Sequence, residues 1–292
     1  VYQPAPKNPN NAGDYDLRNT VVTDADGRFT ITGLAGEGAL AVETTSDAYI
    51  RTPRKIGGRR EDMHPQGFAS VDVPREGEIK PVEMAVRKGV SLEARVLDPD
   101  GRPVDEVTAM YLGIDAALID VWNQGREFSD GLFKIPGADP ERTYRVYFVK
   151  PESRLGTVAE LKYDPSGKPL EVHLQPTATI VGRLGAPGEP PQGTQAHVSM
   201  LLKKERKEYT RDELFDENNV QFYANIIGQR NYYFHDGQPD EKGEFRFEAI
   251  IPGVGYYVSG GGGTREFRAP VWDLKPGEVR DLGTLKLEER PR

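Results

Sequence analysis

The sequence contains no cysteine among its 292 residues. It therefore predicts no disulfide, no thiolate metal site and no cysteine nucleophile. The compartment stays open, because a chain without disulfides is compatible with the cytosol and with the outside of a cell. Long apolar runs are absent too. None approaches the roughly eighteen uninterrupted apolar residues of a membrane-spanning helix, so the sequence predicts no membrane span in this region.

Positive charge is outweighed by negative charge, since 38 Lys and Arg residues stand against 46 Asp and Glu residues and give a net charge of −8. Proteins that bind nucleic acids normally draw on a basic surface, so we predict no nucleic-acid partner. The chain begins Val1-Tyr2, without an initiator methionine or a signal-like segment. We expect it to be part of a longer or processed chain.

Catalytic motifs are lacking as well. No Gly-x-Ser-x-Gly elbow occurs, and a papain-type site is impossible without cysteine. The glycine run 260–263 lacks the Lys-Ser/Thr pair of a phosphate-binding loop. No metal-ligand spacing connects the four histidines, His64, His173, His197 and His235. The sequence therefore predicts no catalytic residue, no cofactor and no metal, in a protein that is not an enzyme.

Glycine and proline are plentiful, with 32 and 23 residues, and favour an all-β chain with many turns. One pattern occurs three times: an acidic turn, a glycine, one residue, a phenylalanine, one residue and an apolar residue. The glycine and phenylalanine of each copy are Gly27 and Phe29, Gly131 and Phe133, and Gly243 and Phe245. Glycine suits a turn position with positive φ, and the alternation that follows predicts a strand with one buried face. We expect the three phenylalanines to be core residues.

The three copies lie roughly 100 to 110 residues apart, which is the usual size of one β-sandwich domain. The sequence therefore predicts three tandem Ig-like Greek-key β-sandwiches. We call them the first repeat (1–88), the second repeat (89–175) and the third repeat (176–288). The second and third repeats open with predicted strands, 90–97 and 178–184, whereas the first repeat has no counterpart of this opening strand.

A family resemblance follows from these motifs. The opening strand of the second repeat ends in Asp-Pro-Asp-Gly-Arg-Pro-Val (98–104), an acidic turn with Gly-x-Phe comes next, and a Pro-Gly or Gly-Leu turn then leads into a Tyr/Val-rich strand. This pattern resembles the carboxypeptidase regulatory-like domain, a small transthyretin-like β-sandwich that recurs in tandem in large bacterial proteins. The resemblance implies a non-catalytic accessory or structural module, and it carries over no catalytic residue.

Paired aspartates in two turns, Asp24 with Asp26 and Asp98 with Asp100, also suggest calcium ligands. Their spacing differs from that of an EF-hand, because glycine follows the second aspartate directly and no distal glutamate is present. Turn chemistry explains both pairs, so we interpret them as turn residues.

The third repeat contains a predicted insertion at about 202–236. Its Thr210-Arg211-Asp212-Glu213 has the form of a capping box and predicts a short helix over 211–217. Aromatic side chains of this region form a candidate ligand-binding group, because flat rings pack locally or stack on the sugars of a polysaccharide. The candidate residues are Tyr209, Phe222, Tyr223, Tyr232 and Tyr233.

Two functions are compatible with these patterns. The first is a structural, scaffold or adhesion segment of a bacterial envelope or extracellular protein, and the second is a carbohydrate-binding accessory module attached to an enzyme.

The missing opening strand lies upstream, is dispensable, or comes from a partner by β-augmentation. An open edge in the first repeat predicts a protein partner or self-association there, with residues 279–292 as candidate donors.

Overall fold

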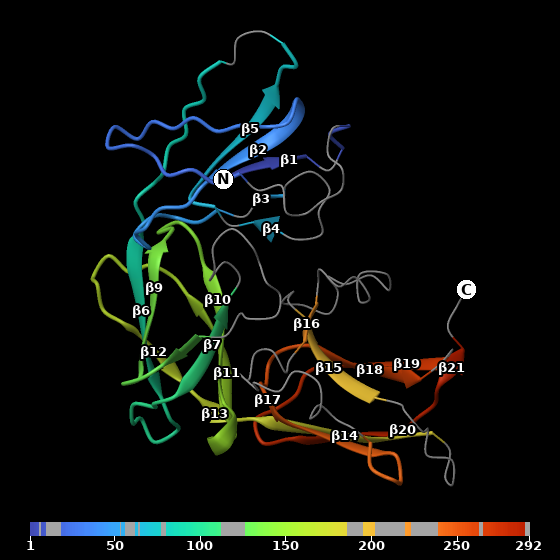
Figure 1. The fold of residues 1–292 in the computed structure, drawn as a ribbon. Coiled ribbons are helices and arrows are strands. Elements are labelled where there is room, and N and C mark those ends of the chain that lie inside the picture. Colours follow the sequence, from blue (N-terminus) through green and yellow to red (C-terminus); the bar gives the residue numbers. More distant parts are fainter. Residues whose placement is uncertain are drawn as a thin grey trace. The chain divides into compact units, whose positions relative to one another are not determined.

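The computed structural model describes residues 1–5, 7–9, 19–52, 54–55, 62–63, 65–76, 80–111, 126–185, 195–201, 220–222, 239–262 and 265–289. In this part of the chain the structure is nearly all β (Figure 1), and its one helical element is the 3-10 turn η1 (Pro151–Ser153). The predicted all-β class is confirmed. The predicted helix over 211–217 lies outside the described residues.

By its internal contacts the chain divides into two compact units. The N-terminal unit holds Val1–Leu92 and Lys134–Arg142. The C-terminal unit holds Glu93 and the described residues that follow it, except Lys134–Arg142. The division into three domains remains a prediction.

The N-terminal unit contains a three-stranded antiparallel sheet in the order β1 (Tyr2–Pro4), β2 (Gly36–Val42) and β5 (Gly67–Val73). A short hairpin of β3 (Arg54–Lys55) and β4 (Asp62–Met63) accompanies it. The Tyr2 ring lies across the sheet at Gly38, where a Cβ would stand 2.6 Å from a ring carbon. Its hydroxyl donates to the carbonyl oxygen of Leu34, so this buried tyrosine fixes the segment before β2 onto the sheet.

The second repeat forms two sheets that pack face to face. One is a five-stranded sheet in the order β13-β11-β10-β7-β8, and the other is a three-stranded sheet in the order β12-β6-β9. Phe133 of β9 contacts Phe128 of β8 and Phe148 of β10, with ring centroids 5.4 Å and 5.2 Å apart. The strands are β6 (Val90–Leu97), β7 (Val107–Tyr111), β8 (Arg126–Phe128), β9 (Leu132–Ala138), β10 (Tyr144–Lys150), β11 (Leu155–Leu161), β12 (Leu170–His173) and β13 (Gln175–Pro176).

The third repeat has the same plan. A three-stranded sheet in the order β17-β14-β20 packs on a five-stranded sheet in the order β16-β15-β18-β19-β21, and the rings of Phe245 and Phe267 stack between them at 6.5 Å. The strands are β14 (Ala178–Leu184), β15 (Gln195–Leu201), β16 (Val220–Phe222), β17 (Glu244–Ile250), β18 (Tyr256–Gly262), β19 (Arg265–Val271), β20 (Val279–Leu285) and β21 (Glu288–Glu289).

The phenylalanine prediction is confirmed in two repeats and wrong in one. Phe133 and Phe245 are each 3% exposed, on β9 and β17. Phe29 is only half-buried, and residues 28–34 form no strand. Residues 82–86 also form no strand, although half-buried and exposed side chains alternate along them. The three glycines do have positive φ, at 76° for Gly27, 63° for Gly131 and 79° for Gly243.

The predicted donor segment is also corrected. Residues 279–292 were candidates for filling the edge of the first repeat, but β20 pairs in parallel with β14, and β21 pairs with β19. These strands are therefore part of the sheets of the third repeat, so they do not fill the edge of the first repeat within this chain.

Candidate functional site

Of the five aromatic residues proposed from the sequence as a ligand-binding group, the structure describes only Phe222. Tyr209, Tyr223, Tyr232 and Tyr233 lie outside the described residues. Phe222 ends β16, and its backbone pairs with Ser199 of β15. The ligand-binding role of these residues stays a prediction.

The acidic turns are built by backbone hydrogen bonds to one carboxylate. At Asp24, Oδ1 accepts from the N–H groups of Asp26 and Arg28 at 3.0 Å and 2.8 Å, and the backbone of Asp24 pairs with that of Arg28. Gly27 donates to the Asp24 carbonyl oxygen at 3.0 Å with φ 76°. The aspartate thus closes its own turn, as an Asx turn does.

The same geometry recurs at two further turns. Asp98 accepts from Asp100 and Arg102 at 2.9 Å each, and Asp240 accepts from Lys242 and Glu244 at 2.8 Å and 2.9 Å. The first aspartate of each pair, Asp24 and Asp98, thus uses one carboxylate oxygen to accept hydrogen bonds from the backbone, as the interpretation of these residues as turn residues predicts. Among the described residues, no group of three or more His, Cys, Asp or Glu side chains is arranged to hold a metal ion.

Turn hydrogen bonds also set the acidity of two carboxylates. The backbone N–H of Glu244, followed by that of Lys242, lowers the pKa of Asp240 below its ordinary value of 3.8. At Asp164, the backbone and the hydroxyl of Ser166 lower the pKa in the same direction. A carboxylate with a lowered pKa is a poor general acid near neutral pH, so these turns favour structure over proton transfer.

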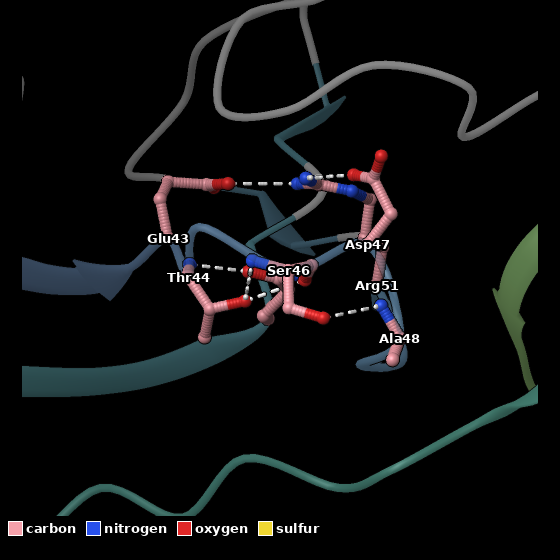
Figure 2. Close-up of polar contacts among 7 residues, drawn as sticks. Glu43, Thr44, Ser46, Asp47, Ala48 and Arg51 are labelled. Atoms are coloured by element: carbon pink, nitrogen blue, oxygen red, sulfur yellow. Dashed lines mark hydrogen bonds and ion pairs between the residues drawn. The ribbon is translucent and has the colours of Figure 1, made fainter.

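A polar cluster holds the loop after β2 (Figure 2). Arg51 donates to Glu43 Oε2 at 2.7 Å and lies 3.9 Å from Asp47 Oδ1. The amide of Gln66, 5% exposed, donates to the Ser46 carbonyl oxygen at 3.0 Å. The hydroxyl of Thr44 donates to the same oxygen at 2.6 Å. The cluster satisfies the backbone of a loop, and sequence reasoning did not identify it because its members are spread over 24 positions.

Two of the four histidines are described. His173 is exposed at the end of β12, and His197 is half-buried on β15. His64 and His235 lie outside the described residues. The two described histidines belong to different sheets.

Within the C-terminal unit, a single hydrophobic cluster joins the second and third repeats. Tyr147 and Val149 of β10 belong to the same buried cluster as Ile250, Ile251 and the rest of the third-repeat core. A Cβ on Gly156 of β11 would stand 3.2 Å from Ile251 Cγ1. The residues of this joint were not identified from the sequence, because both faces of β10 carry apolar residues.

An ion-pair network lies at the same joint. Arg154, in the αL conformation after η1, donates to Glu248 of β17 at 3.0 Å, and Arg246 donates to the other oxygen of Glu248 at 2.7 Å. These contacts lower the pKa of Glu248, with the hydrogen bond from Arg246 as the largest cause. Exposed ion pairs contribute little to stability, so the apolar contacts hold the joint and the network orients it.

Comparison with known proteins gives no close relative. No protein-family model matches the chain, and no curated protein matches it. Among solved structures, it is similar to the Bacillus anthracis TIE protein at 12% identity and a TM-score of 0.23, over 86% of this chain. The chain spans only 42% of that protein's length.

Two pilins show similar scores. The shaft pilin SpaA from Lactobacillus rhamnosus GG is 8% identical with a TM-score of 0.23, over 70% of this chain and 98% of that one. A streptococcal ancillary pilin is 12% identical with a TM-score of 0.20, over 90% and 77%. Scores of this size identify no shared fold, so the function proposed below rests on the geometry of this chain alone.

Proposed function

We propose that this chain is a non-catalytic structural segment, a spacer or scaffold, of a bacterial protein at the cell envelope or outside the cell. The observation that carries the proposal is the shared hydrophobic cluster between the second and third repeats. A spacer must hold its ends at a fixed separation, and domains that bury a common apolar core do not hinge freely.

Turn chemistry supports the non-catalytic part of this proposal. The first aspartate of each turn has a structural role in this proposal, because one of its carboxylate oxygens accepts hydrogen bonds from backbone N–H groups of its own turn. The recurrence of this turn, together with the shared sheet order of the second and third repeats, also supports membership of the carboxypeptidase regulatory-like family.

The proposal also includes adhesion or self-association through the first repeat. A structural segment of this kind meets other proteins through sheet edges, and the described residues of the first repeat form one three-stranded sheet and one two-stranded hairpin. We assign its open edge as the place where a protein partner binds.

Spin-label distance measurements test the spacer. The absence of native cysteine lets labels be placed cleanly at Lys168→Cys and Glu241→Cys, two exposed positions in the second and third repeats. We expect one narrow distance distribution. Labels at Glu241→Cys and Lys286→Cys, both in the third repeat, give the width due to the labels alone. A distribution much broader than this control contradicts a rigid spacer.

Activity measurements test the non-catalytic part. Purified protein is expected to turn over no peptide or glycoside substrate. Reproducible turnover that one carboxylate substitution abolishes overturns the proposal. Glycan binding that is lost in Tyr232→Ala and Tyr233→Ala instead assigns a carbohydrate-binding role.

A further inference from the structure

The first and last strands of the three-stranded sheet are parallel neighbours in both the second and the third repeat (Figure 1). In the second repeat, residues 94–97 of β6 pair in parallel with residues 170–173 of β12. In the third repeat, β14 pairs in parallel with β20 between residues 179–184 and residues 279–285, with one register shift. The chain therefore enters each of these sheets on one strand of a parallel ladder and leaves the sheet on the other strand.

A parallel ladder places the entry and the exit of the chain at opposite ends. The N-terminal end of β14 lies beside the N-terminal end of β20, so the chain enters at one end of the ladder and leaves at the other. Tension between the entry and the exit pulls the two strands in opposite directions along their length. All hydrogen bonds of the ladder are then loaded together, whereas a pull across one end breaks them one after another. The ladder is therefore loaded in the direction in which its bonds act together.

Backbone hydrogen bonds close both ends of the β14–β20 ladder. At the entry, the N–H of Thr179 donates to the carbonyl oxygen of Glu278 at 2.8 Å. At the exit, the N–H of Gly185 donates to the carbonyl oxygen of Leu285 at 3.1 Å. Tension along the chain therefore meets bonded residues as soon as it reaches either end of the ladder.

Core packing also opposes the sliding of β14 along β20. Ile180 and Leu184 of β14 are 0% and 1% exposed and belong to the hydrophobic core of the third repeat. Leu282 and Leu285 of β20 are partly buried and pack against the same core. Protein interiors are close-packed, so a displacement of one strand along the other breaks these apolar contacts together with the hydrogen bonds.

The position of each last strand directs tension through the ladder. In the sheets of the described residues, β20 is an edge strand beside β14, and β12 is an edge strand beside β6. Just past β12, the N–H of Leu174 donates to the carbonyl oxygen of Leu97 at 2.8 Å. Within these sheets, tension that enters on the opening strand and leaves on the last strand has to cross the parallel ladder between them.

We propose that the second and third repeats bear mechanical tension along the chain, and that the parallel ladders β6–β12 and β14–β20 carry this load. The inference deepens the spacer function and rests on it, because a segment that holds two ends at a fixed separation is loaded when those ends are pulled apart. Load-bearing adds a requirement that rigidity alone does not make: resistance to unfolding depends on the direction of the force.

Single-molecule pulling of the full chain tests the third repeat, because forced unfolding is governed by the unfolding barrier. Handles attach only to introduced cysteines, since the chain has none of its own. The pair Gln175→Cys and Lys286→Cys loads the β14–β20 ladder along its length. The pair Gln175→Cys and Lys275→Cys loads the same ladder across its entry end. All three positions are exposed, and the two pairs share one handle, so they differ in the direction of the load.

The load along the ladder is expected to unfold the third repeat at a force about twofold higher, or more, than the load across its end at equal loading rate. The second repeat allows the same comparison. Ser91→Cys with Gln175→Cys loads the β6–β12 ladder along its length, and Ser91→Cys with Lys168→Cys loads it across its entry end. The first of these pairs is likewise expected to require the higher force.

Equal unfolding forces in the two directions, in either repeat, overturn the proposal, and so does a lower force along the ladder. The spin-label distances are measured without load and do not depend on the pulling direction. A rigid spacer without load-bearing ladders and a flexible chain are therefore distinguished, and the spacer function stands or falls separately.

Discussion

At the scale of single residues, the structure assigns the repeated phenylalanines unequal roles. Phe245 is buried against Phe247 and Phe267, with centroids 5.5 Å and 6.5 Å away, whereas Phe29 is half-buried. Phe245→Ala is therefore expected to cost about 3–5 kcal/mol of unfolding free energy. Phe29→Ala is expected to cost clearly less, because a partly exposed ring loses less buried area. Denaturant unfolding of the two variants measures the difference, and equal losses contradict the burial found here.

Acid sensitivity belongs to the same scale. The folded-state pKa of Asp240 is lower than its unfolded value, so its contribution to stability is present above about the ordinary value of 3.8 and is lost as the pH falls through the folded pKa. Asp240→Asn removes the charge that the backbone N–H groups of Glu244 and Lys242 stabilise. The stability difference between the natural protein and this variant should be largest near neutral pH and shrink below pH 3.8. A difference independent of pH contradicts this assignment.

At the scale of elements, turns and opening strands were the most predictable features. The strands predicted at 90–97 and 178–184 are found at those residues, because apolar residues recur at alternate positions along each and Pro/Gly turns follow them. The strand predicted after Gly27 is not formed, and residues 82–86 form none either, although burial alternates along both segments. Alternation fixes which side chains face a sheet, but a strand also needs a neighbour to pair with, and neither segment belongs to a sheet of the described residues.

Two glycines allow a matched test of the turns. Gly101 and Gly243 have φ of 81° and 79°, but only Gly243 has a neighbour within reach, with the Leu184 carbonyl oxygen 2.5 Å from a would-be Cβ. Gly101→Ala should cost roughly 1–2 kcal/mol from the left-handed conformation alone. Gly243→Ala should lower the unfolding free energy by about 1–3 kcal/mol more than Gly101→Ala, because the added methyl group overpacks against the Leu184 carbonyl oxygen. Thermal unfolding compares them, and a smaller loss at Gly243 refutes the predicted geometry.

At the scale of the whole molecule, the very short linker at 175–177 indicates limited hinging between the second and third repeats, but the residues that join their cores could not be predicted. The sequence indicates only that Tyr147 and Val149 belong to a buried strand. The structure shows that their side chains lie in the hydrophobic cluster of the third repeat. The candidate ligand site could not be predicted for another reason. An aromatic insertion can pack on itself or bind a sugar, and its sequence is compatible with both.

The joint predicts a shared loss of stability. Ile251 is fully buried in the common cluster, next to Gly156 of β11. Ile251→Ala should cost about 2–5 kcal/mol and lower the unfolding free energy measured by probes in both repeats. Val279→Ala, at a position that is 59% exposed, is the control and should change little. A loss confined to the third repeat shows that the two cores are independent.

Hydrogen exchange of the intact protein at increasing denaturant tests the central claim most directly, because it reports the opening free energy of each strand. If the second and third repeats form one rigid segment, the most protected amides of β10, β11, β17 and β18 share one opening free energy and one denaturant dependence. Amides of β1, β2 and β5 are expected to open at a lower free energy. Separate opening free energies for the second and third repeats, each with its own denaturant dependence, contradict the account.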